Sequence, residues 1–353
     1  MKVQIGLLLT LLLLSCSNSE VEEVSDCNNA IEITNFNTST LIDEIPEDAL
    51  QALTKAPNEE GALGRNKEGY FHVRFQLDIL YLAVYALRFE NKEALDQFFL
   101  ASDYSFNRQL PTGDFELVVP ESLQNSGVAS LGDRLSANAF FLSAFGTGFS
   151  FLLRSTWFME NHFTEYEERI NMLKNKLLLA GNYLYQNKTV LMEYDKNAPN
   201  RLLFDALAFY SLSSVVTQES WKQLSFELIG SVTQKQNETG FYIENDGYDS
   251  SYNGVSLKLA GILLALLPDG ESIKNELSRS VYCACAWQVS RVLPSGEIST
   301  EGNERVYPGG ELFLGEEKQM AWVDTFLAFQ FFKNQFLNLS LENKADAIKA
   351  YYQ

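Results

Sequence analysis

The chain has 353 residues, of which 46% are hydrophobic, and its 46 acidic and 27 basic side chains give a formal net charge of −19. A chain of this length can bury a large core, and its acidic balance argues against nucleic acid as a partner. An anionic ligand would therefore need a local group of basic side chains. The two histidines and four cysteines show no metal-ligand spacing, so we expect neither a metal nor another cofactor.

The amino terminus has the pattern of an exported protein. Lys2 supplies a positive charge, an apolar run covers 5–14, and Leu14-Ser15-Cys16 precedes a polar segment. The run is shorter than the roughly 20 apolar residues of a membrane span. Its ending resembles the bacterial lipobox, which implies removal of residues 1–15, lipidation of Cys16 and an envelope location, with the outer membrane favoured. An ordinary signal peptide with a chance cysteine at the cut is the alternative.

Residues 16–29 are polar and acidic, as in a flexible tether, and 30–353 are expected to form one domain. Apolar residues at helical spacing predict nine helices, which cover 71–89, 134–158, 163–185, 200–213, 219–234, 252–267, 271–292, 318–337 and 341–351. The segments 110–119 and 240–244 are predicted to be strands or extended loops.

The remaining cysteines favour a structural interpretation. Cys283 and Cys285 lie in a predicted helix, where residues two apart point to different sides. We therefore expect buried thiols, with a disulfide from Cys27 to one of the two as the alternative in an oxidising compartment.

A repeat is visible in the spacing of the helices. The first helix of each successive pair begins near 70, 133, 199, 253 and 318, at intervals of roughly 54 to 66 residues. The loops at Gly69, Gly240 and Gly296 share a polar-Gly pattern. Helical hairpins that need neighbours to cover their apolar faces form rings or solenoids. The expected fold class is therefore all-α, built from about five to six repeated hairpins.

Three segments carry a resemblance to a known group of folds. They are the run 247–257, the helix start Asn200-Arg201-Leu202-Leu203, and 301–305. Together they resemble α/α-toroid carbohydrate-active proteins, a group that includes polysaccharide lyases and several glycoside hydrolases. The resemblance covers about 65–340 and implies a complete or incomplete toroid whose loops bind oligo- or polysaccharide at one opening. It matches no single family, so it assigns no catalytic residue.

The favoured reaction is β-elimination from an acidic glycan. It needs a group that neutralises a carboxylate, a base for the neighbouring C–H, and an acid for the leaving oxygen. A tyrosine can be the base where an arginine lowers its pKa. The candidate catalytic residues are Tyr248, Tyr252, Asn253 and Arg305, and the candidate substrate-binding residues are Arg201, Tyr242, Glu244, Asp249, Glu301 and Asn303.

Two other functions stay open at this point. A glycoside hydrolase would need a pair of carboxylates, for which Glu244, Asp246, Asp249 and Glu301 are candidates. A lipid-anchored protein that binds glycan or acts as a scaffold would need no catalytic group. Loop tyrosines and asparagines also cap helices and pack hairpins, and His72 can serve as a base or as a helix cap.

Overall fold

The computed structural model describes residues 33–118, 130–313 and 315–353. The predicted leader, the predicted lipidation site Cys16, the predicted tether and Cys27 lie outside the described residues. Helices account for 67% of the chain, which confirms the all-α prediction.

The first half of the domain contains α1 (Thr38–Glu44), α2 (Glu47–Leu53), η1 (Gly64–Glu68), η2 (Val73–Gln76), α3 (Ile79–Arg88), α4 (Lys92–Phe106), α6 (Leu131–Arg154), α7 (Thr156–Asn161), α8 (Phe163–Gln186) and α9 (Lys188–Asp195). The second half contains α10 (Pro199–Val216), α11 (Glu219–Gln234), α12 (Ser250–Leu266), α13 (Ser272–Ser290), β1 (Leu312–Phe313), β2 (Glu316–Glu317), α14 (Trp322–Phe332), η3 (Leu337–Leu339) and α15 (Leu341–Tyr352). The two short strands are antiparallel, with Leu312 opposite Glu317.

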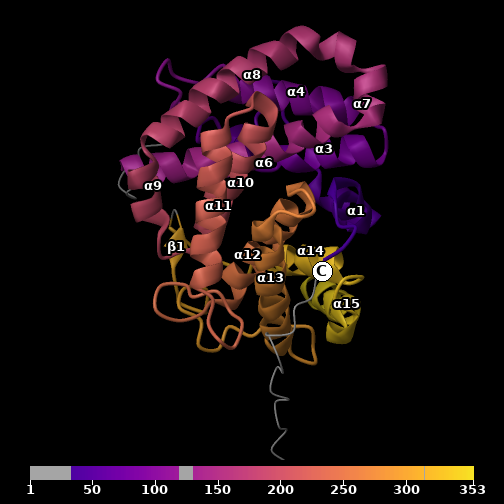
Figure 1. Ribbon diagram of the computed structural model, residues 1–353, viewed down its shortest axis with the longest axis vertical. Coiled ribbons are helices and arrows are strands. Elements are labelled where there is room, and N and C mark those ends of the chain that lie inside the picture. Colours follow the sequence, from indigo (N-terminus) through magenta and orange to yellow (C-terminus); the bar gives the residue numbers. More distant parts are fainter. Residues whose placement is uncertain (1–32, 119–129, 314) are drawn as a thin grey trace, which may run out of the picture.

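Five helices contact one another in chain order: α3 packs on α6, α6 on α10, α10 on α12, and α12 on α14. We call these the inner helices. Four of them also pack against the helix that follows, namely α4, α11, α13 and α15, while α8 contacts both α6 and α10 (Figure 1). The short α1 contacts α3, α12 and α14, so it connects the first and last inner helices.

The inner helix α6 forms the centre of the core. It is the one helix among the described residues that is long and apolar enough to cross a membrane, and its apolar window is 100% buried inside the protein. Rings of Phe98, Phe106 and Phe141 all lie within 6 Å of another core ring. The predicted core role of its phenylalanines is confirmed, since each is buried: Phe140, Phe141, Phe145, Phe149 and Phe151.

One turn recurs four times before an inner helix. It covers 58–63, 110–115, 237–242 and 293–298, and each copy has the same pair of backbone hydrogen bonds. Its glycine has a positive φ, between 90° and 107°. A Cβ there would collide with a backbone carbonyl oxygen of a helix outside the inner five, which is α4, α8, α13 or α15 in the four copies. Only glycine fits both demands, and the four are Gly61, Gly113, Gly240 and Gly296.

The structure corrects the repeat predicted from the loops. Gly69 does not belong to it, because a Cβ at Gly69 would meet nothing within 4 Å, and Gly61 takes its place. The segment 110–119, predicted as a strand or an extended loop, contains the Gly113 turn together with isolated bridges. The segment 240–244 likewise belongs to a turn with isolated bridges.

Two predicted helices change in ways that position the site. The predicted helix 71–89 breaks into η2 and α3, and a further helix, α4, follows it. The predicted helix 318–337 begins only at Trp322 and ends at Phe332, and Ser251 Oγ accepts a hydrogen bond from the backbone N–H of Ala321 just before it. Lys318 therefore lies in a loop.

Cys283 and Cys285 are both buried, as expected.

Candidate functional site

Five polar side chains meet at the amino-terminal ends of α12 and α14. We call them the Arg305 cluster, and they are Glu244, Tyr252, Arg305, Glu311 and Lys318. Glu244 precedes α12, Tyr252 lies in its first turn, and the other three belong to the loop before α14. The cluster therefore joins two successive hairpins.

Asp249 holds these two loops together. It is the N-cap of α12, and its Oδ1 accepts hydrogen bonds from the backbone N–H groups of Ser251 and Tyr252. Its Oδ2 accepts from the backbone N–H groups of Arg305 and Val306. Asp249 is therefore a positioning residue that fixes Arg305 next to the first turn of α12.

Arg305 is the centre of the cluster. Its guanidinium binds both oxygens of Glu311, with Nε–Oε2 at 2.7 Å and Nη2–Oε1 at 3.0 Å, and its Nη1 pairs with Glu244. The guanidinium carbon lies 4.3 Å from the ring centroid of Tyr252. Lys318 Nζ donates to Tyr252 Oη at 2.6 Å and pairs with Glu311 at 2.9 Å. Tyr252 thus has a cation on its face and another at its hydroxyl.

Burial sets the charge states of two groups that can move protons. Burial raises the pKa of Tyr252 far above its usual range, and this outweighs the opposing effect of Arg305. The expected lowered tyrosine pKa is therefore wrong, and Tyr252 stays a protonated donor at neutral pH. Burial also lowers the pKa of Lys318 to about 8, although its hydrogen bond to Glu311 opposes the shift. A fraction of Lys318 is then free amine near neutral pH.

The two carboxyl groups of the cluster differ. Burial raises the pKa of Glu244 to about 7, and Arg305 counteracts only part of this effect. Burial also acts to raise the pKa of Glu311, but its hydrogen bonds from Arg305 and Lys318 lower that pKa to about 2. Both carboxyl groups bind the same guanidinium, so they do not oppose each other across a ligand as a hydrolase pair does.

A second charged group lies next to the cluster, at the junction of α9 and α10. Arg201 Nη1 donates to Asp195 Oδ1 at 3.1 Å, and Asp195 and Asp205 are both fully buried. Burial, reinforced by the charge of Asp195, raises the pKa of Asp205 well above its usual value, so the fold disfavours the charged form of Asp205. The backbone N–H of Asn245, next to Glu244, donates to the carbonyl of Asn197 at 2.9 Å, so the α9–α10 junction and the Arg305 cluster are adjacent.

The other predicted site residues have structural roles. The ring of Tyr248 packs on Trp287, and its hydroxyl donates to the backbone carbonyl of the exposed Glu301. Tyr242 is buried, and its hydroxyl accepts a hydrogen bond from Ser280.

Two asparagines that we expected in the site instead connect backbone segments. The side chain of Asn253 bonds Tyr242 N, Ala284 O and Gln288 Oε1 inside the core. Asn303 joins the backbone of Ser250 to that of the loop before α14, and it is 8% exposed. Neither amide is free to contact a ligand.

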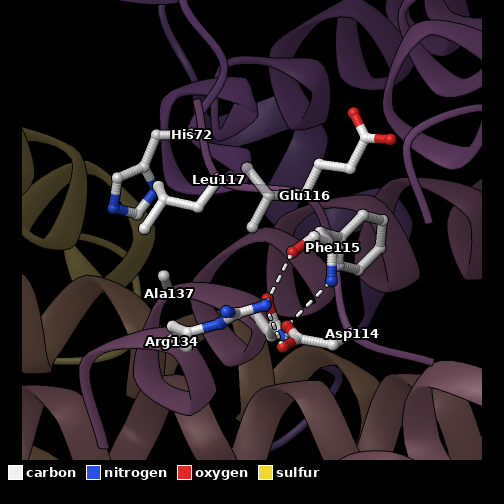
Figure 2. A pocket seen from close by; sticks show the side chains of 9 residues that line it. His72, Asp114, Phe115, Glu116, Leu117, Arg134 and Ala137 are labelled. Carbon is white, nitrogen blue, oxygen red and sulfur yellow. Dashed lines mark hydrogen bonds and ion pairs between the residues drawn. The ribbon is translucent and has the colours of Figure 1, made fainter. Parts of the chain in front are cut away.

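His72 is a helix cap, one of the two roles predicted for it. Its Nδ1 accepts the backbone N–H of Arg74 at 3.3 Å, and burial lowers its pKa to about 4. Figure 2 shows the small cavity beside it, with Asp114 and Arg134 paired on the other side. The cavity of about 10 Å³ has room for about one water molecule, which is too little for a sugar.

Two larger hollows lie at the other end of the inner helices. Their volumes are about 470 Å³ and 410 Å³, and both are lined by Thr38 of α1 and by Arg154 at the carboxyl end of α6. Neither is lined by a residue of the Arg305 cluster. The candidate site is therefore placed at the Arg305 cluster, where buried groups with shifted pKa values meet.

Three charged residues of this region were not among the candidates predicted from the sequence. Lys318 falls inside the predicted helix 318–337 and Arg74 inside the predicted helix 71–89, while Glu311 lies in the same polar loop as Arg305 but was not chosen as a site residue. Clustered cations in so acidic a chain were the available signal.

No group of three or more metal-ligating side chains occurs within the described ranges.

The chain matches no known protein-family model, and a comparison with curated proteins finds no relative.

Proposed function

We propose that this protein binds an acidic polysaccharide in the opening of an α/α ring of helical hairpins and cleaves it by β-elimination. The observation that carries the proposal is the geometry of Tyr252, whose hydroxyl accepts a hydrogen bond from Lys318 at 2.6 Å while Arg305 lies 4.3 Å from its ring. A proton donor, an amine base and a cation are thus in direct contact. Elimination requires these three kinds of group.

The ring arrangement has its own support. The inner helices contact one another in chain order, and α1 contacts both α3 and α14. The four equivalent glycine turns also give four hairpins the same contact between turn and outer helix. Repeated units of this kind that curve back on themselves form a toroid. The amino-terminal ends of the inner helices then surround one opening, which contains the Arg305 cluster.

The proposed reaction balances within this cluster. The free amine of Lys318 takes the C–H proton next to the sugar carboxylate, and that electron pair forms the C=C bond. The C–O bond to the leaving sugar breaks, and the Tyr252 phenol protonates the leaving oxygen. The ammonium of Lys318 then returns a proton to Tyr252 along their hydrogen bond. Arg201 and Arg305 stabilise the negative charge that develops on the carboxylate.

The test is to incubate the purified full-length protein in detergent micelles with polygalacturonate, alginate and glucuronan. Elimination creates a C=C bond conjugated to the carboxylate, which absorbs in the ultraviolet, whereas hydrolysis creates reducing ends alone. Tyr252→Phe should reduce turnover by about 100-fold or more, the usual contribution of a positioned acid or base. Tyr248→Phe is the matched control, because that hydroxyl binds only the backbone of Glu301, and it should retain activity.

Other outcomes would change the assignment. Reducing ends without absorbance, lost in Glu244→Gln, would identify a hydrolase. Binding of the polymers without cleavage would leave a glycan-binding lipoprotein. No binding to any of the three polymers would reject the carbohydrate proposal.

A further inference from the structure

Arg74 differs from the other cations around the Arg305 cluster in having no anionic partner. Arg201 pairs with Asp195, Arg305 with two glutamates, and Lys318 with Glu311. Within the described ranges, by contrast, the guanidinium of Arg74 has neither an ion pair nor a hydrogen bond; the hydrogen bond to His72 Nδ1 comes from its backbone N–H.

Two aromatic rings hold this guanidinium in place. Its central carbon lies 4.5 Å from the ring centroid of Phe140 on α6 and 4.8 Å from that of Phe313 on β1. Phe140 itself packs on Phe204 of α10, with centroids 4.1 Å apart, so the ring beneath the cation is held firmly. Cation–π contacts fix the group but leave its five N–H donors unused.

The position of Arg74 is unfavourable for an isolated cation. Burial lowers its pKa to about 10, and the positive charge of Arg201 adds to this shift. The group nevertheless remains charged at neutral pH. The chain has 46 acidic residues from which a partner could come. Arg74 is half-buried; a partly desolvated cation without a counter-ion opposes folding, and an anionic ligand would reduce that penalty.

We propose that Arg74 is the subsite that binds the carboxylate of the sugar acid. This inference rests on the proposed function, since it takes the ligand to be an acidic glycan. The planar fork of a guanidinium matches the two oxygens of a carboxylate, which makes it selective for that group over a hydroxyl. Phe313, which the Arg74 guanidinium contacts, follows Glu311 of the Arg305 cluster by two residues, so a carboxylate bound to Arg74 would lie near Lys318 and Tyr252.

Binding measurements test the subsite directly. Titration calorimetry of the full-length protein would use trigalacturonate, its methyl ester, which lacks the charge, and a sulfated trisaccharide. Arg74→Gln should weaken trigalacturonate binding by about 10-fold to 100-fold, the usual effect of losing a charged hydrogen-bond pair. Binding of the methyl ester should not change between the two proteins. Equal loss for both ligands would overturn the proposal, and loss confined to the sulfated sugar would replace carboxylate by sulfate ester.

Arg88→Gln is the matched control. Arg74 lies in η2, whereas this variant removes the same charge from the last residue of α3, where Arg88 pairs with Asp43. Binding of trigalacturonate to this variant should equal that of the wild type. A decrease similar to that of Arg74→Gln would indicate a general charge effect and contradict a specific subsite.

Stability provides a second measurement, which distinguishes a ligand-binding role of Arg74 from a purely structural role. Arg74→Met keeps an apolar side chain between the two phenylalanines and removes the unpaired charge, so its unfolding midpoint in urea should equal or exceed that of the wild type. A lower midpoint together with unchanged binding would show that Arg74 only supports the fold. If Tyr252→Phe keeps full turnover while Arg74→Gln loses carboxylate binding, the elimination mechanism fails and the subsite stands.

Discussion

At the scale of the residue, burial rather than local sequence determines what the charged groups can do. Tyr252 lies beside Arg305, yet burial raises its pKa and makes it an acid rather than a base. Glu244 is ion-paired with Arg305, yet its pKa rises to about 7 because it is 2% exposed. A sequence shows which charges are neighbours along the chain but not how far water is excluded from them.

Glu244 gives a prediction about pH. Its pKa rises from 4.5 to about 7 on folding, so the folded state holds an extra proton between these values and stability falls as pH rises through that window. Between pH 4.5 and 7 the free energy of unfolding of the wild type should fall relative to Glu244→Gln, by at most about 3 kcal/mol. Urea unfolding at a series of pH values measures this difference.

The pH dependence of the free energy of unfolding is compared, rather than its absolute value, because Glu244→Gln also changes the contact with Arg305. Exposed Glu301 provides the control substitution, Glu301→Gln, which should follow the wild-type pH profile. Parallel profiles for the wild type and Glu244→Gln would contradict the raised pKa.

At the scale of the element, glycines set how closely α12 approaches α14. A Cβ at Gly254 would collide with Thr325, and one at Gly261 would press against Phe331. Both glycines lie on the face of α12 that packs on α14. This close contact aligns the first turn of α12 with the loop that carries Arg305, so helix packing contributes directly to the geometry of the site.

Substitution of these glycines yields a prediction with opposite signs at two positions. Gly254→Ala should destabilise the protein by about 1–3 kcal/mol, because overpacking exceeds the gain in helix propensity. Gly230→Ala on α11 should instead stabilise it by up to about 1 kcal/mol, since a Cβ there meets nothing within 4 Å. Thermal or urea unfolding of the two variants would reveal the signs, and stabilisation by Gly254→Ala would refute the close contact.

Elements with strong local signals were predicted well. The predicted helix 219–234 coincides with α11, and 163–185 differs from α8 by one residue. The start of α14 was misplaced by four residues because its first turn is preceded by a loop that Ser251 stabilises through a long-range hydrogen bond. The helix α4 was missed, although Asn91 caps it and apolar residues recur along it at helical spacing.

At the scale of the whole molecule, the protein is strongly acidic, whereas four cations gather around the Arg305 cluster: Arg74, Arg201, Arg305 and Lys318. The net charge of −19 would repel an acidic polymer at long range. Salt screens that repulsion, while contacts with partly buried cations are screened less. The proposed ligand should therefore bind the cations near the amino-terminal ends of the inner helices rather than the general surface.

The proposed envelope location leads to a prediction about the leader. In the wild type, lipid on Cys16 should direct the protein to the detergent phase on phase partitioning. Cys16→Ser should remove the acyl chains and shift the protein to the aqueous phase, without change in the helical content of its far-ultraviolet spectrum. Aqueous partitioning of the wild type would contradict the lipid anchor.

Neighbouring residues carry helical periodicity and local polarity, so the sequence alone was enough to predict the all-α class and most of the helices. Local polarity also made Arg305, Tyr252 and Glu244 candidates, and the structure brings these three side chains together. Only the tertiary structure separated these three from Tyr248, Asn253 and Asn303, whose side chains satisfy backbone and core contacts. It also brought in Lys318 and Arg74, which lie 66 residues after and 178 residues before Tyr252. The charge state of each group depends on burial, and burial arises only when distant hairpins pack together.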